Sequence, residues 1–216
     1  MRICFVSSGG VEAFLQRGKE EKCDVTLFCF EEKEVEYEEE LNGKTHLFED
    51  VASLSKRTSG VVVCGAKTKA YGQMRNSAIV AQKGKILGVA DMTRSIGDEV
   101  VCGAPLKVFD TVAGKIGVIV ADDLYFPETA HSLTECGADT LVCPLAKEIT
   151  PLERVLFRAT AFFYGVPILF CGRGSAGIAD YQANESFYTP FSPVETVFER
   201  KKQYALVSTR RRIFRT

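Results

Sequence analysis

Short apolar runs recur along the chain, separated by polar stretches that contain glycine, proline or aspartate. The runs are rich in valine and isoleucine, a composition and length typical of β-strands. Strands are therefore predicted at 3–6, 25–30, 61–64, 77–81, 86–90, 116–120, 140–143, 166–171 and 204–208.

Apolar residues at helical spacing fill some of the intervals between these runs. Helices are predicted over 10–22, 127–136 and 151–164, and prolines open the last two. In the third helix, the spacing places five apolar side chains on one stripe. These residues are Leu152, Val155, Leu156, Ala159 and Phe163.

The order of these elements predicts an α/β domain with mixed sheets. Strand–helix–strand units at 3–30, 116–143 and 140–171 imply parallel neighbours. Segment 76–91 is expected to form a hairpin, since Gly84 in QKGK supplies a positive φ. Segment 174–195 is turn-rich and predicts a mobile loop over a rim. No linker divides the chain, so 1–216 is expected to be one domain.

Composition and charge exclude several classes of protein. The net charge of -1 gives no reason to expect nucleic-acid binding, and no apolar stretch approaches the ~20 residues of a membrane span. The start, MRICFVSS, suits a buried strand rather than a signal peptide. Segment 31–40 holds seven glutamates and is interpreted as solvated surface, or as a partner of the basic end. That end contains Arg210, Arg211, Arg212 and Arg215.

Cysteine and histidine usage indicates a reducing compartment. The chain has eight cysteines without a C-x-x-C pair, and only two histidines. Several cysteines lie within or at the ends of apolar runs, as reduced, buried thiols do. We therefore expect a cytoplasmic protein without a metal site. No dinucleotide motif is found and Gly172-Arg173-Gly174 is a weak phosphate-loop match, so no cofactor is expected.

Several motifs, in order and with agreeing spacing, resemble the nitrilase superfamily of carbon–nitrogen hydrolases. They are NSAIVAQKGKILGVAD (76–91), LKVFDTVAGKIGVIVADDLYFPE (106–128), GADTLVCPLA (137–146), RATAFFYGVPILFCGRG (158–174) and, more weakly, FSPVETVFE (191–199). The resemblance implies an α-β-β-α sandwich. It also implies a homo-oligomer, a dimer or larger, whose subunits stack across helices near the strand-to-helix junction at Ala121, here called the elbow.

The resemblance places three catalytic roles on positions of this chain. The family uses a cysteine thiolate that attacks a nitrile or amide carbon, a glutamate base, and a lysine that stabilises the tetrahedral intermediate. The cysteine position falls on Ala121 and the lysine position on Met92. Strict spacing puts the glutamate position on Phe30; Glu31 takes it only if the strand carries one extra residue. The chain is therefore expected to lack the standard Glu-Lys-Cys set.

Seven residues are candidates for the pocket around these positions. They are Glu31, Met92, Arg94, Ala121, Asp122, Cys143 and Cys171. The resemblance implies that Asp122 occupies a variable position facing the pocket, and that Asp123 is a structural aspartate, which is expected to cap the following helix. Cys143 and Cys171 end strands that should flank the elbow strand, so either is a candidate for a relocated nucleophile.

These observations favour a nitrilase-fold protein that has lost carbon–nitrogen hydrolase activity. It would act as a small-molecule-binding, regulatory or oligomer-partner module, and a small amide or carboxylate is the expected ligand. A purely structural scaffold with a filled pocket is a second interpretation. The enzymatic alternative is an amidase- or nitrilase-type hydrolase with an engineered alanine at 121 or a relocated cysteine nucleophile.

Overall fold

Two β-sheets packed face to face form the centre of the protein in the computed structural model, which describes residues 1–18, 22–97, 100–103 and 106–200. The first sheet has the order β13 (Val194–Val197), β1 (Arg2–Val6), β2 (Val25–Phe30), β4 (Val61–Ala70), β5 (Gln73–Gln82), β6 (Lys85–Asp91), and β3 (Val35–Glu36) pairs with β4. The second has the order β12 (Glu185–Thr189), β11 (Ser175–Ala179), β10 (Ile168–Gly172), β9 (Thr140–Pro144), β8 (Gly114–Val118), β7 (Val108–Thr111).

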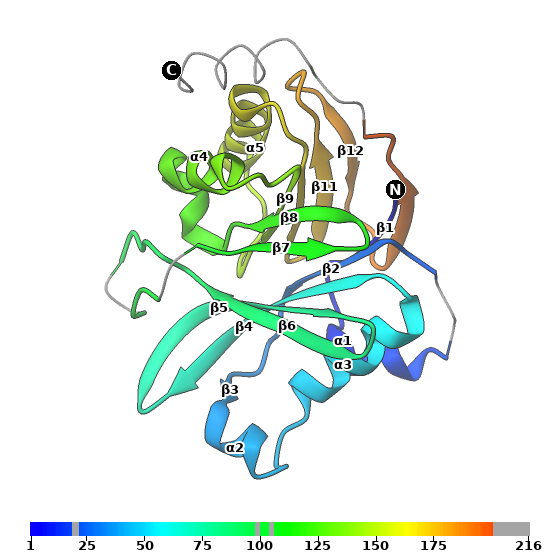
Figure 1. Cartoon of the computed structure of the whole chain (residues 1–216), viewed down its shortest axis with the longest axis vertical. Coiled ribbons are helices and arrows are strands. Elements are labelled where there is room, and N and C mark those ends of the chain that lie inside the picture. Colours follow the sequence, from blue (N-terminus) through cyan, green and yellow to red (C-terminus); the bar gives the residue numbers. More distant parts are fainter. Residues whose placement is uncertain (19–21, 98–99, 104–105, 201–216) are drawn as a thin grey trace.

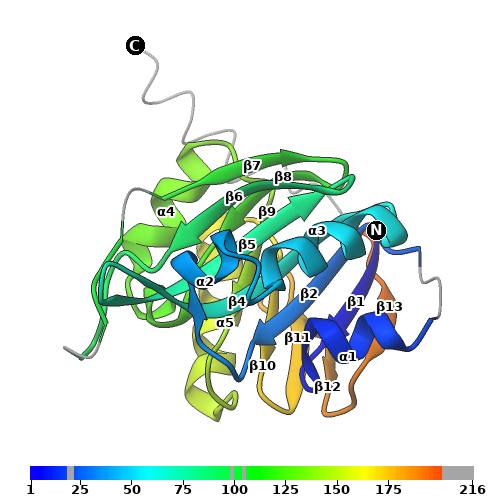
Figure 2. The same ribbon diagram turned by 90° about the horizontal axis from the view of Figure 1, so that it is seen from below.

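Helices cover the outer face of each sheet. On the first sheet lie α1 (Gly10–Gln16) and α3 (Leu47–Thr58), with the short α2 (Tyr37–Leu41) nearby (Figures 1 and 2). The 3₁₀ helix η1 (Ala121–Tyr125), α4 (Pro127–Glu135) and α5 (Pro151–Tyr164) cover the second (Figure 1). The predicted α-β-β-α sandwich with mixed sheets is confirmed. No helix in the described part of the chain is long and apolar enough to span a membrane.

The hydrophobic core consists of three clusters, one for each interface between layers. The inner cluster fills the space between the sheets and includes Phe5, Val63, Val118, Val142 and Leu169. A second cluster lies between the second sheet and α4 and α5, and a third between the first sheet and α1 and α3. Since both faces of the central strands are buried, β1, β2, β9 and β10 read as near-continuous apolar runs.

Most predicted elements are confirmed, with shifted ends. The strands of all three strand–helix–strand units are parallel, and β5 and β6 form the predicted hairpin, with Gly84 at a φ of 79°. The first helix ends at Gln16 instead of residue 22, and the elbow strand ends at Val118. The predicted strand 204–208 and the basic end lie outside the described residues.

The loop predicted for 174–195 is wrong, because the segment contains β11, β12 and the start of β13. Gly172-Arg173-Gly174, the weak phosphate-loop match, forms the tight turn between β10 and β11. The buried strand β11 consists largely of small residues, which make room for larger neighbours. Its sequence therefore lacks the large apolar residues that indicate a strand. A Cβ on Gly177 would lie 2.6 Å from Cζ of Phe170. The composition of segment 174–195 is therefore similar to that of a loop, although the segment forms strands.

The acidic segment is only partly solvated surface. The carboxylate of Glu40 accepts hydrogen bonds from the backbone N–H groups of Leu47 (2.9 Å) and Phe48 (3.2 Å), which open α3. Such N–H groups have no partner within the helix. Glu36 pairs with Lys69 at 3.5 Å. Glutamates of this run thus stabilise local structure within the described residues.

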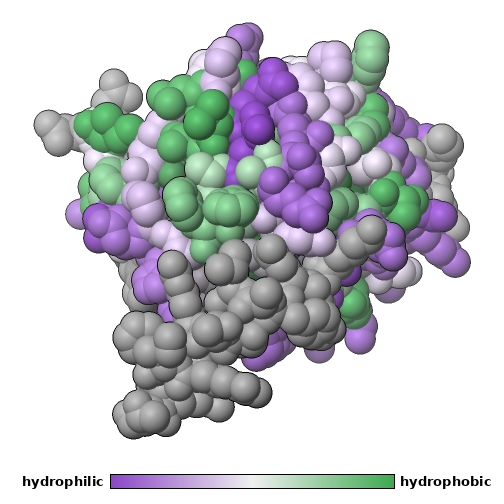
Figure 3. Space-filling view, turned by 90° about the horizontal axis from the view of Figure 1, so that it is seen from above, coloured by the Kyte–Doolittle hydropathy of each residue, from purple (hydrophilic) through white to green (hydrophobic). Residues whose placement is uncertain are grey.

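Helix α5 turns its predicted apolar stripe partly outward. Its buried residues include Glu153, Phe157 and Ala161, whereas Leu152 and Phe163 from the predicted stripe are exposed. Val155 and Phe162 are exposed as well, at 57% and 45%. The face viewed from above in Figure 3 accordingly carries hydrophobic patches. An apolar outer face on a helix is unusual for a surface that meets only water.

Candidate functional site

The backbone of the elbow is strained at Ala121, whose side chain is a single methyl group. After β8, Ile119 continues the pairing with β9 through its N–H and the Val142 carbonyl (2.9 Å). The chain then turns at Ala121, whose φ is 47°. A left-handed conformation costs a non-glycine residue about 1–2 kcal/mol, and such strain is concentrated at functional sites. Ala121 is 5% exposed, so its methyl group lies in the core.

Three positions that the resemblance assigns to the family's catalytic roles belong to the inner cluster. Phe30, Met92 and Ala121 are all buried members of it. The register between β2 and β4 shifts between Phe28 and Phe30, and the Phe30 ring lies against Gly65, where a Cβ would be 2.3 Å from Cδ2. Asn76 Nδ2 approaches the Met92 sulfur at 3.7 Å. The three positions thus contribute apolar side chains.

Glu31 points away from this cluster. Its Oε1 accepts a hydrogen bond from the Val11 N–H at 2.7 Å and contacts the Cys64 thiol at 3.8 Å. Val11 and Cys64 belong to the third cluster, on the opposite face of the first sheet. Burial raises the pKa of Glu31, and the Val11 N–H opposes that rise. Phe30 therefore shares the inner cluster with Ala121 and Glu31 does not, although β2 carries the one-residue register shift on which the Glu31 alternative depended.

Asp123 does not cap the following helix, contrary to the prediction. Its carboxylate is 1% exposed and accepts hydrogen bonds from Thr93 N (3.0 Å), Thr93 Oγ1 (2.7 Å) and Arg94 N (3.0 Å). Helix α4 has no side-chain cap. Burial raises the pKa of Asp123, and these donors limit the rise. Asp122 accepts weakly from Ile96 N (3.5 Å) near the surface. Both carboxylates thus hold the segment after β6 against the elbow.

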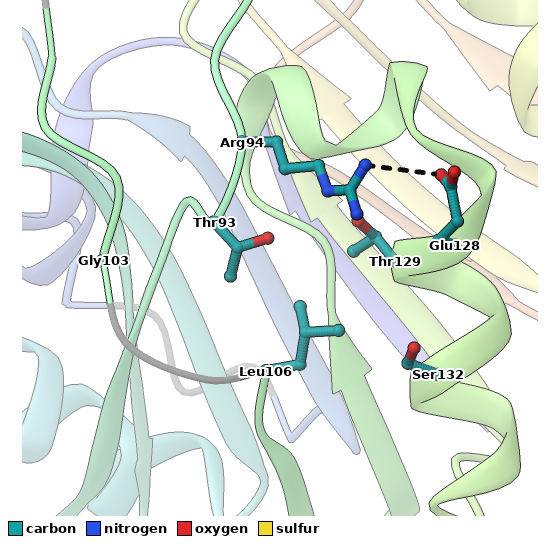
Figure 4. Close-up of a pocket in the computed structure, with 7 residues that line it drawn as sticks. All are labelled: Thr93, Arg94, Gly103, Leu106, Glu128, Thr129 and Ser132. Carbon is teal, nitrogen blue, oxygen red and sulfur yellow. Dashed lines mark ion pairs between the residues drawn. The ribbon is translucent and has the colours of Figure 1, made fainter.

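A pocket of about 600 Å³ lies on the α4 side of this segment (Figure 4). Its lining residues are Thr93, Arg94, Gly103, Leu106, Glu128, Thr129 and Ser132. Arg94 is the one predicted pocket residue among them. Its Nη1 lies 3.8 Å from Glu128 Oε2, and its guanidinium lies 5.4 Å from the centre of the Phe126 ring. The sequence signal missed here was the i, i+3 spacing of Thr129 and Ser132, which places two hydroxyls on one helix face.

The two cysteines proposed as relocated nucleophiles are in different layers. Cys171 belongs to the inner cluster with Ala121, but Cys143 belongs to the second cluster, below α4 and α5. Both are 0% exposed, and burial raises the pKa of each thiol well above its ordinary value. Because the thiolate is the form that attacks an amide or nitrile carbon, neither has the properties of the family's catalytic nucleophile.

A buried carboxylate on α5 binds the elbow helix from the other side. Glu153 accepts hydrogen bonds from Tyr125 and Thr150, and its Oε1 lies 2.9 Å from Lys147 Nζ. Lys147 also donates to the Tyr125 hydroxyl at 2.7 Å. Burial acts to raise the pKa of Glu153, but these donors outweigh it and lower the pKa to about 2. The T-x-x-E sequence at 150–153 was an available signal, because it is a capping box.

The histidines lie apart from these groups. His46 precedes α3 and pairs with Glu49 at 3.5 Å, and His131 on α4 packs 5.8 Å from the Tyr164 ring. Among the residues that the structure describes, no group of three or more His, Cys, Asp or Glu side chains could hold a metal ion.

Comparisons with known proteins agree with this architecture. The family model described as carbon-nitrogen hydrolase matches residues 23–188. The solved structure of Saccharomyces cerevisiae Nit3, a member of branch 10 of the nitrilase superfamily, is similar with a TM-score of 0.74 and 14% identity, covering 100% of this chain and 95% of that chain. An amidase from Nesterenkonia sp. is similar with a TM-score of 0.73 and 15% identity, covering 90% and 88%. At such identities the likeness shows the fold alone. Curated proteins yielded no match.

The left-handed backbone at Ala121 leads to a stability prediction. Ala121→Gly removes a buried methyl group, worth about 1 kcal/mol, but relieves about 1 kcal/mol of backbone strain. Ala78→Gly, in β5, removes an equally buried methyl group at an unstrained position. We expect the first change to cost at least about 1 kcal/mol less than the second in urea unfolding. Equal losses would contradict the strain.

The low pKa of Glu153 predicts a defined pH dependence. A carboxylate with a lowered pKa stabilises the fold above its unfolded pKa and loses this effect as pH falls through its folded pKa. Wild type should therefore exceed Glu153→Gln in unfolding free energy by on the order of 3 kcal/mol at about pH 6, and the gap should close toward about pH 2. Chemical unfolding across this range measures it. Glu148→Gln, an exposed neighbour, should show no such gap; a constant gap for Glu153→Gln would refute the assignment.

Proposed function

The chain belongs to the carbon–nitrogen hydrolase family, and from this premise we propose that it has lost the family's standard hydrolytic chemistry and serves as an oligomer-partner module. One observation carries the proposal. The resemblance assigns the roles of base, oxyanion-stabilising cation and nucleophile to Phe30 or Glu31, Met92 and Ala121, and of these Phe30, Met92 and Ala121 are buried in the inner cluster.

Each of these side chains lacks the property that its role requires. A methyl group cannot form an acyl intermediate, so the step that a thiolate divides in two has no nucleophile. A thioether carries no positive charge for the developing oxyanion, a role commonly worth several kcal/mol. An aromatic ring cannot accept the proton from an attacking water. The related Nesterenkonia amidase, in contrast, is known with the acetamide moiety of fluoroacetamide added at an active-site cysteine.

The enzymatic alternative has little support at these positions. An engineered alanine at 121 would explain one change and leave Met92 and Phe30 unexplained. A nucleophile relocated to Cys143 would be in the wrong layer, and at Cys171 the thiolate is disfavoured.

A small ligand finds its best support in the pocket beside α4. Arg94 supplies one cation there, and Thr129 and Ser132 lie on the facing helix (Figure 4). A carboxylate or amide group is complementary to this set of donors. Glu128 already pairs with Arg94 at 3.8 Å, so an anionic ligand would compete with it.

The exposed face of α5 supports a role in assembly with a second copy. Leu152, Val155, Phe162 and Phe163 are 45–68% exposed on one helix, and the surface seen in Figure 3 shows hydrophobic patches. Contiguous exposed apolar side chains mark interaction sites. Two-fold symmetry would bring the same face of each copy together. The helices near the elbow are those through which the resemblance implied a dimer.

The argument from Met92 and Phe30 predicts the outcome of restoring a thiol. Ala121→Cys alone should release no more ammonia from short aliphatic amides and nitriles than wild type, since no oxyanion partner stands at 92. Mass spectrometry and circular dichroism check that the introduced thiol is present and the fold intact. Turnover above the wild-type background from this single change would contradict the proposal.

The assembly role predicts the effect of a charge on α5. Wild type should sediment as a dimer or larger species, and Phe163→Asp should weaken association at least about tenfold, because a buried unpaired charge costs more than about 1.4 kcal/mol. The control is Leu41→Asp, on an exposed residue that ends α2 far from this face (Figure 1). Sedimentation velocity distinguishes them. A monomeric wild type, or equal behaviour of both variants, would argue against this interface.

A further inference from the structure

Two cysteines of the inner cluster lie where the backbones of the two sheets come within hydrogen-bonding distance. Cys29 is near the end of β2 and Cys171 near the end of β10. Phe30 N, next to Cys29, donates to the Leu145 carbonyl at 3.4 Å, and Leu145 N donates to the Cys171 carbonyl at 2.8 Å. Typical facing sheets are about 10 Å apart. The approach here is much closer, which brings the two side chains within reach of each other.

The two cysteines both belong to the inner cluster at this contact, and the acidity of each thiol depends on the other. Cys171 Sγ also lies 3.4 Å from the Val6 carbonyl on β1, and Cys29 Sγ lies 3.6 Å from the Phe30 carbonyl. Each sulfur is thus held by the backbone on the first sheet. A disulfide between them would join the two sulfurs at ~2.05 Å.

The two thiols differ in acidity and in exposure. The Cys171 S–H bond lowers the pKa of Cys29, and the charge of Arg173 acts in the same direction against burial and Glu31. Burial raises the pKa of Cys171 well above its ordinary value. Cys29 is 9% exposed, whereas Cys171 is 0% exposed. Cys29 is therefore the more acidic of the two thiols and the one that a small reagent meets first.

We propose that Cys29 and Cys171 form a redox-active dithiol site that a hydroperoxide oxidises to a disulfide joining the two sheets. This activity is independent of the loss of hydrolysis proposed above. It uses none of the positions at 30, 92 and 121.

The chemistry balances with hydrogen peroxide as the oxidant. The Cys29 thiolate attacks one peroxide oxygen, the O–O bond breaks, and the departing hydroxide takes up the proton that Cys29 lost, giving a sulfenic acid and water. The Cys171 sulfur then attacks the Cys29 sulfur and the S–O bond breaks. The second hydroxide leaves with the Cys171 proton as water. Two thiols lose two electrons in total, and one peroxide gains them.

The remaining cysteines provide internal comparisons. Cys143 is as buried as Cys171, and burial raises its pKa well above the ordinary value, so it should resist oxidation. Cys102 and Cys136 are exposed, so they can react with oxidant or link two molecules. A Cys102→Ser, Cys136→Ser background therefore removes the principal competing reactions without changing the inner cluster.

Peptide mapping of the full chain in this background tests the proposal. The folded protein is exposed to hydrogen peroxide, remaining thiols are alkylated in denaturant, and the digest is mapped without reduction. We expect a cross-linked peptide pair containing residues 29 and 171, two hydrogens lighter than the separate peptides and released by reductant. With Cys171→Ser, dimedone should label Cys29 as the trapped sulfenic acid. The control Cys143→Ser should cross-link as the parent does.

Other outcomes would overturn the proposal. One is that the parent protein, folded and treated with peroxide, shows no cross-link between residues 29 and 171. The other is that dimedone labels Cys29 no more strongly than Cys143. Because the parent chain itself carries the decisive measurement, a failure of either serine variant to fold does not affect the result. Hydrolytic turnover from Ala121→Cys would leave this cross-link untouched, so the two proposals fail separately.

Discussion

The carboxylate of Asp123 binds the two sheets together at the elbow. It is buried on the 3₁₀ helix that follows β8 of the second sheet, and it accepts three hydrogen bonds from Thr93 and Arg94, which follow β6 of the first. A buried charge without donors would cost several kcal/mol, so this arrangement tolerates little variation. It fixes Met92 in the inner cluster on one side and directs Arg94 toward α4 on the other.

The charged side chains near the elbow accordingly lie around the inner cluster and not within it. Within the inner cluster, Phe30 and Met92 each contribute about 1.5–3 kcal/mol of hydrophobic stabilisation, where a glutamate and a lysine would need mutual pairing to be buried. The ionised groups lie around it. Glu153 pairs with Lys147 between α5 and the elbow helix, and Arg94 pairs with Glu128 at the pocket beside α4.

The sequence predicted those features that depend on local periodicity or on fixed spacing. The parallel units and the hairpin follow from the runs of apolar residues and from the glycine in QKGK. The strand β11 could not be predicted, because its small residues acquire meaning only when the Phe170 ring packs against Gly177. The outward stripe of α5 was missed for a related reason. Periodicity finds an apolar face, but it cannot tell whether that face meets the same chain or another molecule.

The partners of Asp123 were likewise beyond the reach of local patterns. An aspartate just before a helix is a common cap, but tertiary donors from a segment 29–30 residues earlier in the chain occupy its oxygens. Asp123 therefore bonds these distant donors and not the start of α4, because the backbone N–H groups of Thr93 and Arg94 also need acceptors. The pocket beside α4 depends on the same segment and was therefore equally hidden.

The left-handed turn at Ala121 separates the ability to fold from the ability to react. Backbone torsion at this residue is set by what precedes and follows it, so the turn forms with a methyl group as its only side chain. The nucleophile of such a junction can therefore be lost while the surrounding architecture remains unchanged. The backbone conformation at position 121 is thus a property of the fold, whereas the chemistry at this position depends on the side chain it carries.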